Sequence, residues 1–360
     1  MAYTLCEKVR DLKPYEPISG TYRIRLDANE SFYNMPDEIK SEIKSIIDTM
    51  NFNRYPDPTA QKPVKAFAAY YGLDPNYVTA TNGSDEMLYL LASAMLQRNS
   101  KVVVVEPDFS MYRFYSFLSE NQIITVQKND MLKINVDQLI ETSNQNGADM
   151  IIFSNPCNPT GQGITADEAR KLVKNVNALV ILDEAYMDFW NESLLKETAQ
   201  YDNLIVLKTA SKAIGSAAIR LGFAVANSAL TRALQAVKSP YNVNTLSQEI
   251  GACIYSHKEL LDARRDEIIC NTKTLYTELL KLKEQYQLPA DIFEPCTNFV
   301  LMRCDFAQLL FEYLLENGIA IRYFAPEYAV RITSGSANEN TELLTYIERY
   351  ILEKYLSESH

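Results

Sequence analysis

Short apolar runs alternate with helix-like segments over residues 78–227 of the chain. The runs are hydrophobic at successive positions, which is typical of parallel strands covered on both faces. The segments between them, such as residues 84–96 and 166–176, repeat their apolar residues with the helical period of about 3.6. We therefore expect an α/β fold with a mostly parallel central sheet and helices on both of its faces. The predicted strands are residues 102–105, 150–153, 178–182, 204–207 and 221–226.

The pattern changes after residue 241. A long, charge-rich helical region reaches residue 286, and the elements after it suit a smaller α+β domain. These elements are a strand at 298–302, a helix at 306–316, a short strand with Arg322 and a helix from about residue 341. The first residues have weak periodicity and indicate an arm. The predicted parts are an N-terminal arm at 1–27, a large domain at 28–245 and a small C-terminal domain at 246–360.

Composition and charge narrow the class of protein. For 360 residues two domains are the default, and 47% hydrophobic with 22% charged residues is ordinary for a soluble globular chain. The net charge of −11 argues against nucleic acid or an anionic membrane as the main partner. The chain starts without a signal-peptide pattern and has no apolar run of about 18 residues, so we expect a cytoplasmic location.

The cysteines and histidines exclude several kinds of site. The six cysteines form no C-x-x-C pair and no metal spacing, so we expect reduced thiols and no metal. Two histidines, His257 and His360, make serine–histidine hydrolysis, cysteine proteolysis and histidine-ligated zinc poor hypotheses. Acid–base chemistry must then come from Lys, Asp, Glu or Tyr.

A lysine follows the fourth predicted strand. Lys212 lies among small and hydroxyl residues in K-T-A-S-K-A-I-G-S-A-A-I-R, and Arg220 stands eight positions later. An amine whose charge is suppressed by burial and a nearby cation can attack an aldehyde and form a Schiff base. The planar guanidinium of Arg220 could bind a phosphate. A lysine and a phosphate site together indicate pyridoxal phosphate (PLP), although most Ser-Lys pairs in proteins are ordinary surface residues.

Three other polar segments follow predicted strands and could contact such a ring. Asp183 could pair with the pyridine nitrogen and keep it protonated, or it could simply cap a helix. Tyr186 and Asn158 could donate hydrogen bonds to the phenolic oxygen of the ring, although with 23 tyrosines a single one is usually packing. Phe109 could stack on the ring, and a core phenylalanine is the equal alternative.

A phosphate site is predicted where N-G-S-D-E opens a helix. Gly83 lets the backbone approach closely, and the free amides of a first helical turn suit an anion. Asp85 and Glu86 also fit simple complementarity to the helix dipole. The side chains that would complete the phosphate site are Thr209, Ser211 and Arg220.

One glycine motif imitates a dinucleotide fingerprint. Gly161-x-Gly163-x-x-Ala166 lies between a predicted strand and a helix, and Asp183 follows 20 residues after Gly163. The glycines of a true fingerprint follow the strand directly, whereas N-P-C-N-P-T intervenes here. The dinucleotide hypothesis also leaves Lys212 unexplained, so we prefer PLP.

Taken in order, the motifs resemble the fold-type I, PLP-dependent aminotransferases, and most closely the histidinol-phosphate aminotransferase family. The resemblance spans nearly the whole chain and implies the PLP-dependent transferase fold. The motifs are L-D-A-N-E (26–30), R-Y-P-D-P (54–58), N-G-S-D-E (82–86), P-D-F-S-M-Y (107–112), N-P-C-N-P-T-G (155–161), D-E-A-Y (183–186), S-K-A with Arg220, S-P-Y-N-V-N (239–244), N-F-V-L (298–301) and R-I-T-S-G (331–335).

The resemblance also implies roles. Lys212 would hold PLP and then shuttle a proton, Asp183 would pair with the ring nitrogen, and Arg331 would bind the substrate carboxylate or phosphate. The other implied ring contacts are Tyr186, Asn158 and Phe109. The implied phosphate contacts are Ser84, Asp85, Thr209, Ser211, Arg220 and, from the other subunit of a homodimer, Tyr55. Further substrate-side candidates are Arg322, Tyr15, Asn29 and Tyr241.

The implied reaction is a ping-pong transamination between L-histidinol phosphate and 2-oxoglutarate, which gives imidazole-acetol phosphate and L-glutamate in histidine biosynthesis. An aromatic amino acid aminotransferase and a threonine-phosphate decarboxylase of the same fold are the alternatives. A PLP-fold transcription regulator would carry an N-terminal helix-turn-helix domain, and the acidic charge also disfavours it. The chain departs from the family at Ser31-Phe32, where the family often has Asn-Pro, so the substrate mouth is expected to differ.

Overall fold

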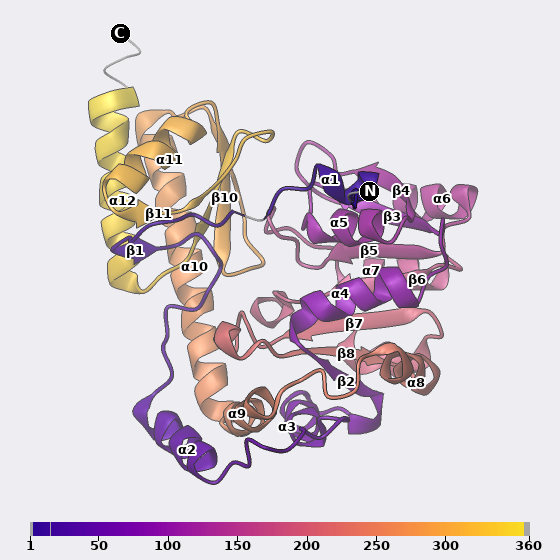
Figure 1. Ribbon diagram of the computed structural model, residues 1–360. Helices are drawn as coiled ribbons and strands as arrows, with labels where there is room; N and C mark the ends of the chain where they lie inside the picture. Colours follow the sequence, from indigo (N-terminus) through magenta and orange to yellow (C-terminus); the bar gives the residue numbers. More distant parts are fainter. Residues whose placement is uncertain (1–2, 15, 356–360) are drawn as a thin grey trace.

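The computed structural model describes residues 3–14 and 16–355 of the chain. Its largest feature is a seven-stranded sheet with the strand order β2-β8-β7-β6-β5-β3-β4 (Figure 1). The strands are β2 (Val78–Thr81), β3 (Lys101–Glu106), β4 (Gln122–Gln127), β5 (Met150–Ser154), β6 (Leu179–Asp183), β7 (Leu204–Thr209) and β8 (Gly222–Ala226).

Most of this sheet is parallel, as the continuous apolar runs predicted, and β8 is the exception. The pairs β3–β4, β3–β5, β5–β6 and β6–β7 are parallel. Strand β8 runs antiparallel to both of its neighbours, β7 and β2. Only a 3₁₀ turn, η4 (Ala217–Ile219), lies between β7 and β8, in place of the crossover helix that usually joins parallel strands. The parallel direction expected for residues 221–226 was therefore wrong, because a continuous apolar run reports burial on both faces and not strand direction.

Helices cover both faces of the sheet (Figure 1). Successive residues of one strand enter two different cores: Val103 and Val105 pack on one face, and Val102 and Val104 pack on the other. The first core includes side chains of α3 (Gln61–Tyr71), α6 (Val136–Asn146), α7 (Ala166–Lys174) and α9 (Thr245–Ser256). The second includes side chains of α4 (Gly83–Ala94), α5 (Met111–Leu118) and α8 (Ser228–Val237).

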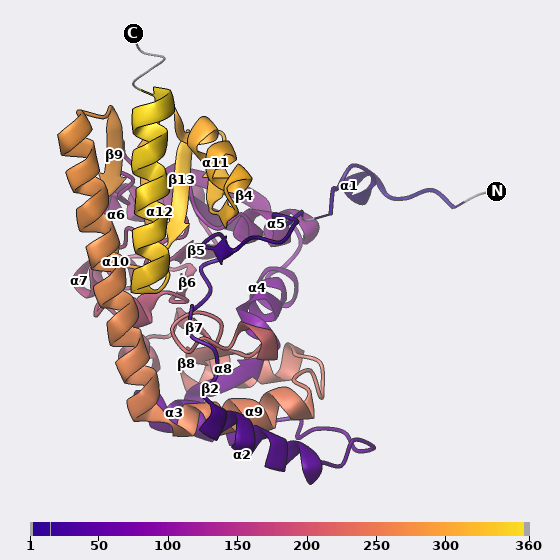
Figure 2. The same ribbon diagram turned by 90° about the vertical axis from the view of Figure 1, so that its left-hand side faces the viewer.

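A second, smaller sheet has its own core. Its four strands are antiparallel in the order β12 (Arg322–Phe324), β13 (Ala329–Thr333), β10 (Phe299–Cys304) and β9 (Ala290–Phe293). Three helices contribute buried side chains to this core: α10 (Lys258–Tyr286), α11 (Ala307–Glu316) and α12 (Ala337–Tyr350). Helix α10 runs the length of the molecule from α9 to the small sheet (Figure 2). The terminal helix starts at Ala337, earlier than predicted, because Ser336 and Glu339 form a capping box.

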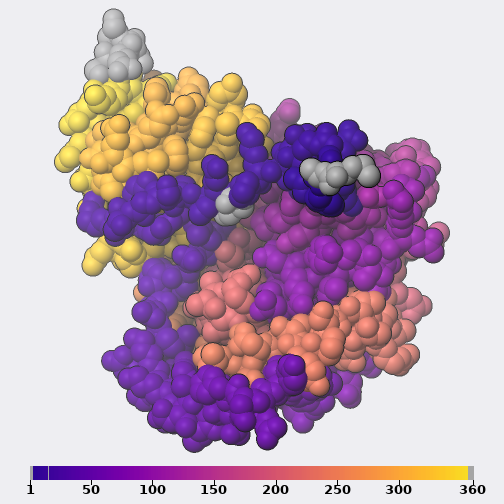
Figure 3. Space-filling model, viewed as in Figure 1, coloured from indigo at the N-terminus to yellow at the C-terminus, as the bar shows by residue number. Residues whose placement is uncertain are grey.

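The N-terminal segment contacts both parts of the molecule (Figure 3). On α1 (Glu7–Arg10), Lys8 pairs with Glu120 at 2.9 Å. Further along, β1 (Ile24–Arg25) pairs in parallel with β11 (Ile319–Ala320). Helix α2 (Asp37–Asp48) follows on the same side as α9. The short remaining elements are η1 (Pro75–Tyr77), η2 (Met187–Phe189), η3 (Leu195–Gln200) and the π-helix η5 (Ile351–Tyr355).

The packing bears on the domain borders, which stay predictions. Ile24 and Leu26, assigned to the arm, lie in the core of the small sheet. Ile254 and Tyr255, assigned to the small domain, lie in a core of the large sheet. We propose that the large domain extends through α9 and that α10 carries the chain into the small domain.

Among the described residues, none of the helices has the length and the apolar character that a membrane span requires.

Candidate active site

The predicted site residues gather at the carboxyl edge of the large sheet. Strands β5, β6 and β7 end at Ser154, Asp183 and Thr209, and Lys212 follows three residues after Thr209. Ligands of open parallel sheets bind beyond this edge, because the loops that leave it surround a common crevice. The fold therefore brings the polar segments of separate strands to one place.

Lys212 is held beside Tyr186 by the segment that precedes α2. Lys212 Nζ donates a hydrogen bond to the carbonyl oxygen of Ala28 at 2.9 Å and lies 5.7 Å from the centroid of the Tyr186 ring. The next residue, Asn29, donates from Nδ2 to the Tyr186 hydroxyl at 2.9 Å. Two consecutive residues thus fix the amine and the phenol relative to each other.

The position of Asn29 depends on the small domain. Asn29 is 1% exposed and has a left-handed backbone, with φ of 55°. The Thr333 hydroxyl accepts from the Asn29 backbone N–H at 3.0 Å and donates to its side-chain oxygen at 2.9 Å. Asn298 Nδ2 donates to the Asn29 carbonyl at 3.2 Å. Thr333 ends β13 and Asn298 directly precedes β10, so contacts with the smaller sheet hold Asn29 in place.

Arg331 reaches the same segment from β13. Its Nη2 donates to the carbonyl oxygen of Asp27 at 2.6 Å, and its Nη1 donates to Asn158 Oδ1. The guanidinium lies 5.3 Å from the ring centroid of Phe299 and 5.6 Å from that of Phe324. The three consecutive residues Asp27, Ala28 and Asn29 therefore hydrogen-bond Arg331, Lys212 and Tyr186 in turn.

Asp183 is a buried carboxylate, 4% exposed, at the end of β6. Its Oδ2 accepts from the Tyr112 hydroxyl at 2.8 Å, and its Oδ1 accepts from the Ala185 backbone N–H at 3.1 Å. Burial, with a smaller contribution from the nearby Asp108 carboxylate, raises the pKa of Asp183 to about 6, although the hydrogen bonds from Tyr112 and Ala185 oppose the rise. A cation placed against Asp183 would reverse this effect, because an opposite charge favours the ionised carboxylate.

The start of α4 forms a cradle for an anion. Gly83 has φ of +78°, and a Cβ there would lie 2.8 Å from Arg220 Nη2. The Arg220 guanidinium makes two long contacts, 3.3 Å to the carbonyl oxygen of Ala217 and 3.4 Å to Asp85, and nearly half of its side chain is exposed. Across the cradle, the Thr209 hydroxyl lies 3.0 Å from that of Ser211. A helix N-terminus, an accessible guanidinium and two hydroxyls fit the phosphate of PLP, and the Asp183 carboxylate fits its protonated nitrogen.

A second lysine near this edge is already engaged in the core. Lys208 Nζ pairs with Asp188 at 2.8 Å, and the Tyr71 hydroxyl donates to the same carboxylate oxygen at 2.9 Å. Both members of the ion pair are almost fully buried. Lys208 therefore has a structural partner, whereas Lys212 stands at the edge with a backbone carbonyl as its hydrogen-bond acceptor.

A buried polar network lies behind Asn158. Ser154 donates from its hydroxyl to Asp108 Oδ1, and the Asn158 backbone N–H donates to Ser154 Oγ at 3.1 Å. Lys128 Nζ lies 3.7 Å from Asp108 Oδ2 and donates to Cys157 Sγ at 2.8 Å. Burial raises the pKa of Asp108, and the Lys128 ammonium opposes that rise. The network positions Asn158, and through it the Arg331 contact.

Removal of the Lys128 charge is expected to destabilise the protein. Lys128→Met leaves Asp108 buried without its cation, which should cost about 3–5 kcal/mol in the free energy of unfolding. Asp108→Asn in the same chain should recover part of that loss. Urea unfolding of both variants measures this, with Lys281→Met as a control, since Lys281 belongs to an exposed ion pair with Glu278. A loss below about 1 kcal/mol for Lys128→Met would contradict the buried pair.

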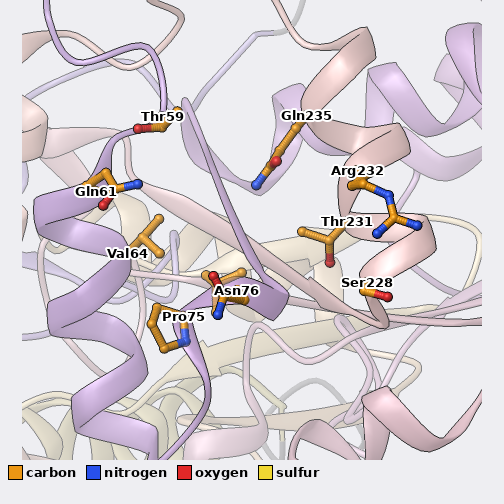
Figure 4. A pocket seen from close by; sticks show the side chains of 10 residues that line it. Thr59, Gln61, Val64, Pro75, Asn76, Ser228, Thr231, Arg232 and Gln235 are labelled. Atoms are coloured by element: carbon orange, nitrogen blue, oxygen red, sulfur yellow. The ribbon is translucent and has the colours of Figure 1, made fainter.

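The residues after Asn29 line a cavity of about 290 Å³ beside the Lys212 loop. Ser31 and Phe32 lie in this lining together with Ser211, so the departure from the family borders a predicted phosphate contact. A separate cavity of about 350 Å³ lies between α3 and α8 (Figure 4). Its lining, which includes Thr59, Arg232 and Gln235, contains none of the predicted site residues.

The other predicted coenzyme and substrate contacts differ in how near they lie to these residues. Tyr55 is 81% exposed and stacks on Tyr241, with 4.7 Å between ring centroids. Arg322 lies opposite Arg331 in the β12–β13 pair. Phe109 packs edge-on against Tyr112 at 5.6 Å. Tyr15 lies outside the described residues.

The sequence reasoning missed the partners of these residues. It assigned no role to Tyr112, which hydrogen-bonds Asp183, or to the buried Lys128 and Asp108. For Tyr112 a signal was present, because it follows Phe109 by three residues and so lies about one helical turn away. For Lys128 there was none, since a lysine at a strand end is usually exposed.

The sequence profile of the aminotransferase class I and II family matches residues 22–347, which is most of the chain. The chain belongs to this family. A histidinol-phosphate aminotransferase of Clostridium novyi (strain NT) is 40% identical over 343 residues and covers 94% of this chain and 95% of its own. A histidinol-phosphate aminotransferase of Clostridium kluyveri is 34% identical over 348 residues. The alignment covers 96% of this chain and 98% of that protein. The family expected from the motifs is thus confirmed.

Similar solved structures confirm the fold. The histidinol-phosphate aminotransferase of Sinorhizobium meliloti, in complex with pyridoxal-5'-phosphate, aligns with a TM-score of 0.86 at 19% identity and covers 98% of this chain and 99% of its own. The L-threonine-O-3-phosphate decarboxylase of Porphyromonas gingivalis aligns with a TM-score of 0.78 at 23% identity. The alignment covers 92% of this chain and 100% of the decarboxylase. At these identities the structures establish the fold alone, since both reactions occur on it.

Proposed function

We propose that this aminotransferase binds PLP and transfers the amino group between L-histidinol phosphate and 2-oxoglutarate. One observation carries the chemistry: the consecutive residues 27–29 hydrogen-bond Arg331, Lys212 and Tyr186, so one short segment holds an anion-binding fork, an amine and a phenol. The substrate is supported by relatives that are 32–40% identical over nearly the full chain and are named histidinol-phosphate aminotransferases.

When bound, PLP supplies an electron sink for the negative charge that develops on the substrate carbon bearing the amino group. In this proposal Asp183 would hold the charge on the ring nitrogen, and Tyr186 and Asn158 would donate hydrogen bonds to the phenolic oxygen. Lys212 Nζ would hold the coenzyme and would also be placed to move a proton at the substrate carbon, because Ala28 and Tyr186 fix its position. Phe109 covers the ring. The proposed phosphate contacts are Ser84, Asp85, Thr209, Ser211 and Arg220.

Arg331 is proposed to bind both substrates in turn. A guanidinium fork matches a carboxylate and a phosphate equally well, so one residue could hold glutamate and histidinol phosphate. Asn29, Arg322, Tyr15 and Tyr241 are proposed as further residues on the substrate side. Ser31 and Phe32 would shape the entrance that the substrate passes.

Replacement of Arg331 by lysine is expected to weaken both substrates together. Arg331→Lys loses the fork geometry but keeps the charge, so KM should rise about 10- to 100-fold for glutamate and for histidinol phosphate. Steady-state kinetics with each substrate measure this. Arg303→Lys on β10 is the matched control, because Arg303 pairs with Asp291 at the surface and its replacement should leave KM unchanged. A rise for one substrate only would contradict a shared binding residue.

We also propose a cytoplasmic homodimer. Tyr55 at 81% and Phe52 at 70% are large side chains left exposed on the same connection between α2 and α3. Exposed aromatic side chains of this size favour a protein partner. In the dimer, Tyr55 would reach the phosphate of the coenzyme bound by the other subunit.

The amino donor tests the proposed function. Purified holoenzyme is assayed with histidinol phosphate, phenylalanine and threonine phosphate, each with 2-oxoglutarate, and glutamate formation and carbon dioxide release are both measured. We expect glutamate from histidinol phosphate at the highest kcat/KM. Turnover of phenylalanine alone would indicate an aromatic aminotransferase, and carbon dioxide from threonine phosphate would indicate the decarboxylase.

A further inference from the structure

Three metal-ligand side chains meet on the surface, away from the sheet edge that holds Lys212. Glu42 lies on α2, Cys253 lies on α9, and His257 follows directly after α9. Helices α2 and α9 lie side by side at the same end of the molecule in both views (Figures 1 and 2). The fold therefore brings together donors that are more than 200 residues apart in the sequence.

The donor atoms are already close to the spacing of a metal site. His257 Nε2 lies 3.1 Å from Glu42 Oε2, and Cys253 Sγ lies 3.3 Å from the same oxygen. All three donor atoms fall within 4.8 Å of one another. Around a tetrahedral zinc ion with ordinary bond lengths, such donors are roughly 3.4–3.6 Å apart. Binding would need shifts of only a few tenths of an ångström for the two pairs that share the Glu42 oxygen.

The helix geometry supports a common ligand. Cys253 and His257 are four residues apart, which puts them on one face at the end of α9. The Glu42 side chain is 51% exposed and the His257 side chain 28%, so an ion could enter from solvent and keep a water as its fourth ligand. Thiolate, imidazole and carboxylate together form a donor set that suits zinc.

We propose that Glu42, Cys253 and His257 form a zinc(II) site that joins α2 to α9. None of the three lies among the residues proposed to bind coenzyme or substrate. The site would act as a cross-link between the segment that leads from Asn29 and the helix that precedes α10. It stands independently of the proposed reaction, because its ligands and its measurement do not involve the substrate.

Metal binding to the PLP-loaded protein tests the site, with zinc(II) alone for affinity and cobalt(II) as a spectroscopic substitute. We expect one ion per chain, a cobalt–thiolate absorption band, and a rise of roughly 3–5 °C in the unfolding temperature at a hundredfold excess over Kd. Cys253→Ala should abolish the band, and Glu42→Gln and His257→Gln should each weaken binding by at least about tenfold.

Cys270→Ala is the matched control, because Cys270 is an exposed free cysteine on α10. This variant should bind zinc as the wild type does, and all four variants should keep the kcat of the wild type. The absence of stoichiometric zinc binding at micromolar metal would overturn the site. Binding that persists unchanged in Cys253→Ala and His257→Gln would overturn it too.

Discussion

Lys212→Ala is expected to reduce kcat for transamination by on the order of 10⁴-fold or more. The substitution removes the amine that attaches the coenzyme and the group that moves the proton, and a positioned acid–base group alone contributes about 10²–10⁴-fold. The visible absorbance of the bound coenzyme should change at the same time. Steady-state assays with histidinol phosphate and absorbance spectra of the dialysed protein measure both effects.

Two lysines serve as comparisons for this result. Lys281→Ala changes an exposed lysine of α10 and should leave activity and spectrum as they are. Lys208 should not replace the lost amine, because it is buried and paired with Asp188 at 2.8 Å. If Lys212→Ala kept an activity within tenfold of wild type, Lys212 would not be the group that holds the coenzyme and moves the proton.

Asp183→Asn is expected to reduce kcat by about 10²–10⁴-fold while the protein stays folded. The amide keeps the shape and can still accept from Tyr112, but it cannot hold a positive charge on the ring nitrogen. Loss of one partner of a buried ion pair costs about 3–5 kcal/mol, which corresponds to this range of rates. Kinetics and far-ultraviolet circular dichroism distinguish the chemical loss from unfolding. A kcat near that of wild type would mean that the ring nitrogen has another partner.

The same substitution should change how the stability of the coenzyme-free protein depends on pH. Because burial raises the pKa of Asp183 to about 6, the folded protein takes up a proton that the unfolded chain, with a carboxyl pKa of about 3.9, has lost. This contribution to stability is fully present below about pH 4 and is lost as the pH rises through about 6. Between about pH 4 and 8, wild type should therefore lose on the order of 3 kcal/mol relative to Asp183→Asn. If the stability of the two proteins changed equally with pH, burial would not raise the pKa of the Asp183 carboxyl on folding.

The sequence predicted the elements that depend on local pattern and burial. The continuous apolar runs at Val102–Val105 and in β5 to β7 are buried on both faces, so their strands could be located from hydrophobicity alone. Strand β4 was missed because only Val126 among its residues is fully buried, and an edge strand shows a weaker pattern. The direction of β8 could not be derived from the same signal.

The candidate site was predictable where a residue follows a strand. Asp183, Thr209 and Lys212 stand at strand ends, and parallel topology brings such ends together. Asn29 and Arg331 depend on contacts between segments more than 300 residues apart in the chain. The buried pair of Lys128 and Asp108 depends on the neighbouring strands β3 and β4, so no local pattern indicated it.

The metal ligands show the same limit. Cys253 and His257 are four residues apart, a spacing that the sequence contains, but their third partner lies on α2. A search for cysteine pairs finds nothing because only one cysteine takes part. Tyr55 presents a different case, since its proposed role needs a second chain.

Reduction of the coenzyme-loaded protein with borohydride, followed by digestion and mass analysis of the peptides, tests the central claim most directly. The reagent fixes any coenzyme that is covalently held by an amine. The account predicts one coenzyme per chain, attached to the peptide that contains Lys212. The account would be contradicted if the protein did not bind the coenzyme, or if the adduct were found on Lys208 or any other lysine.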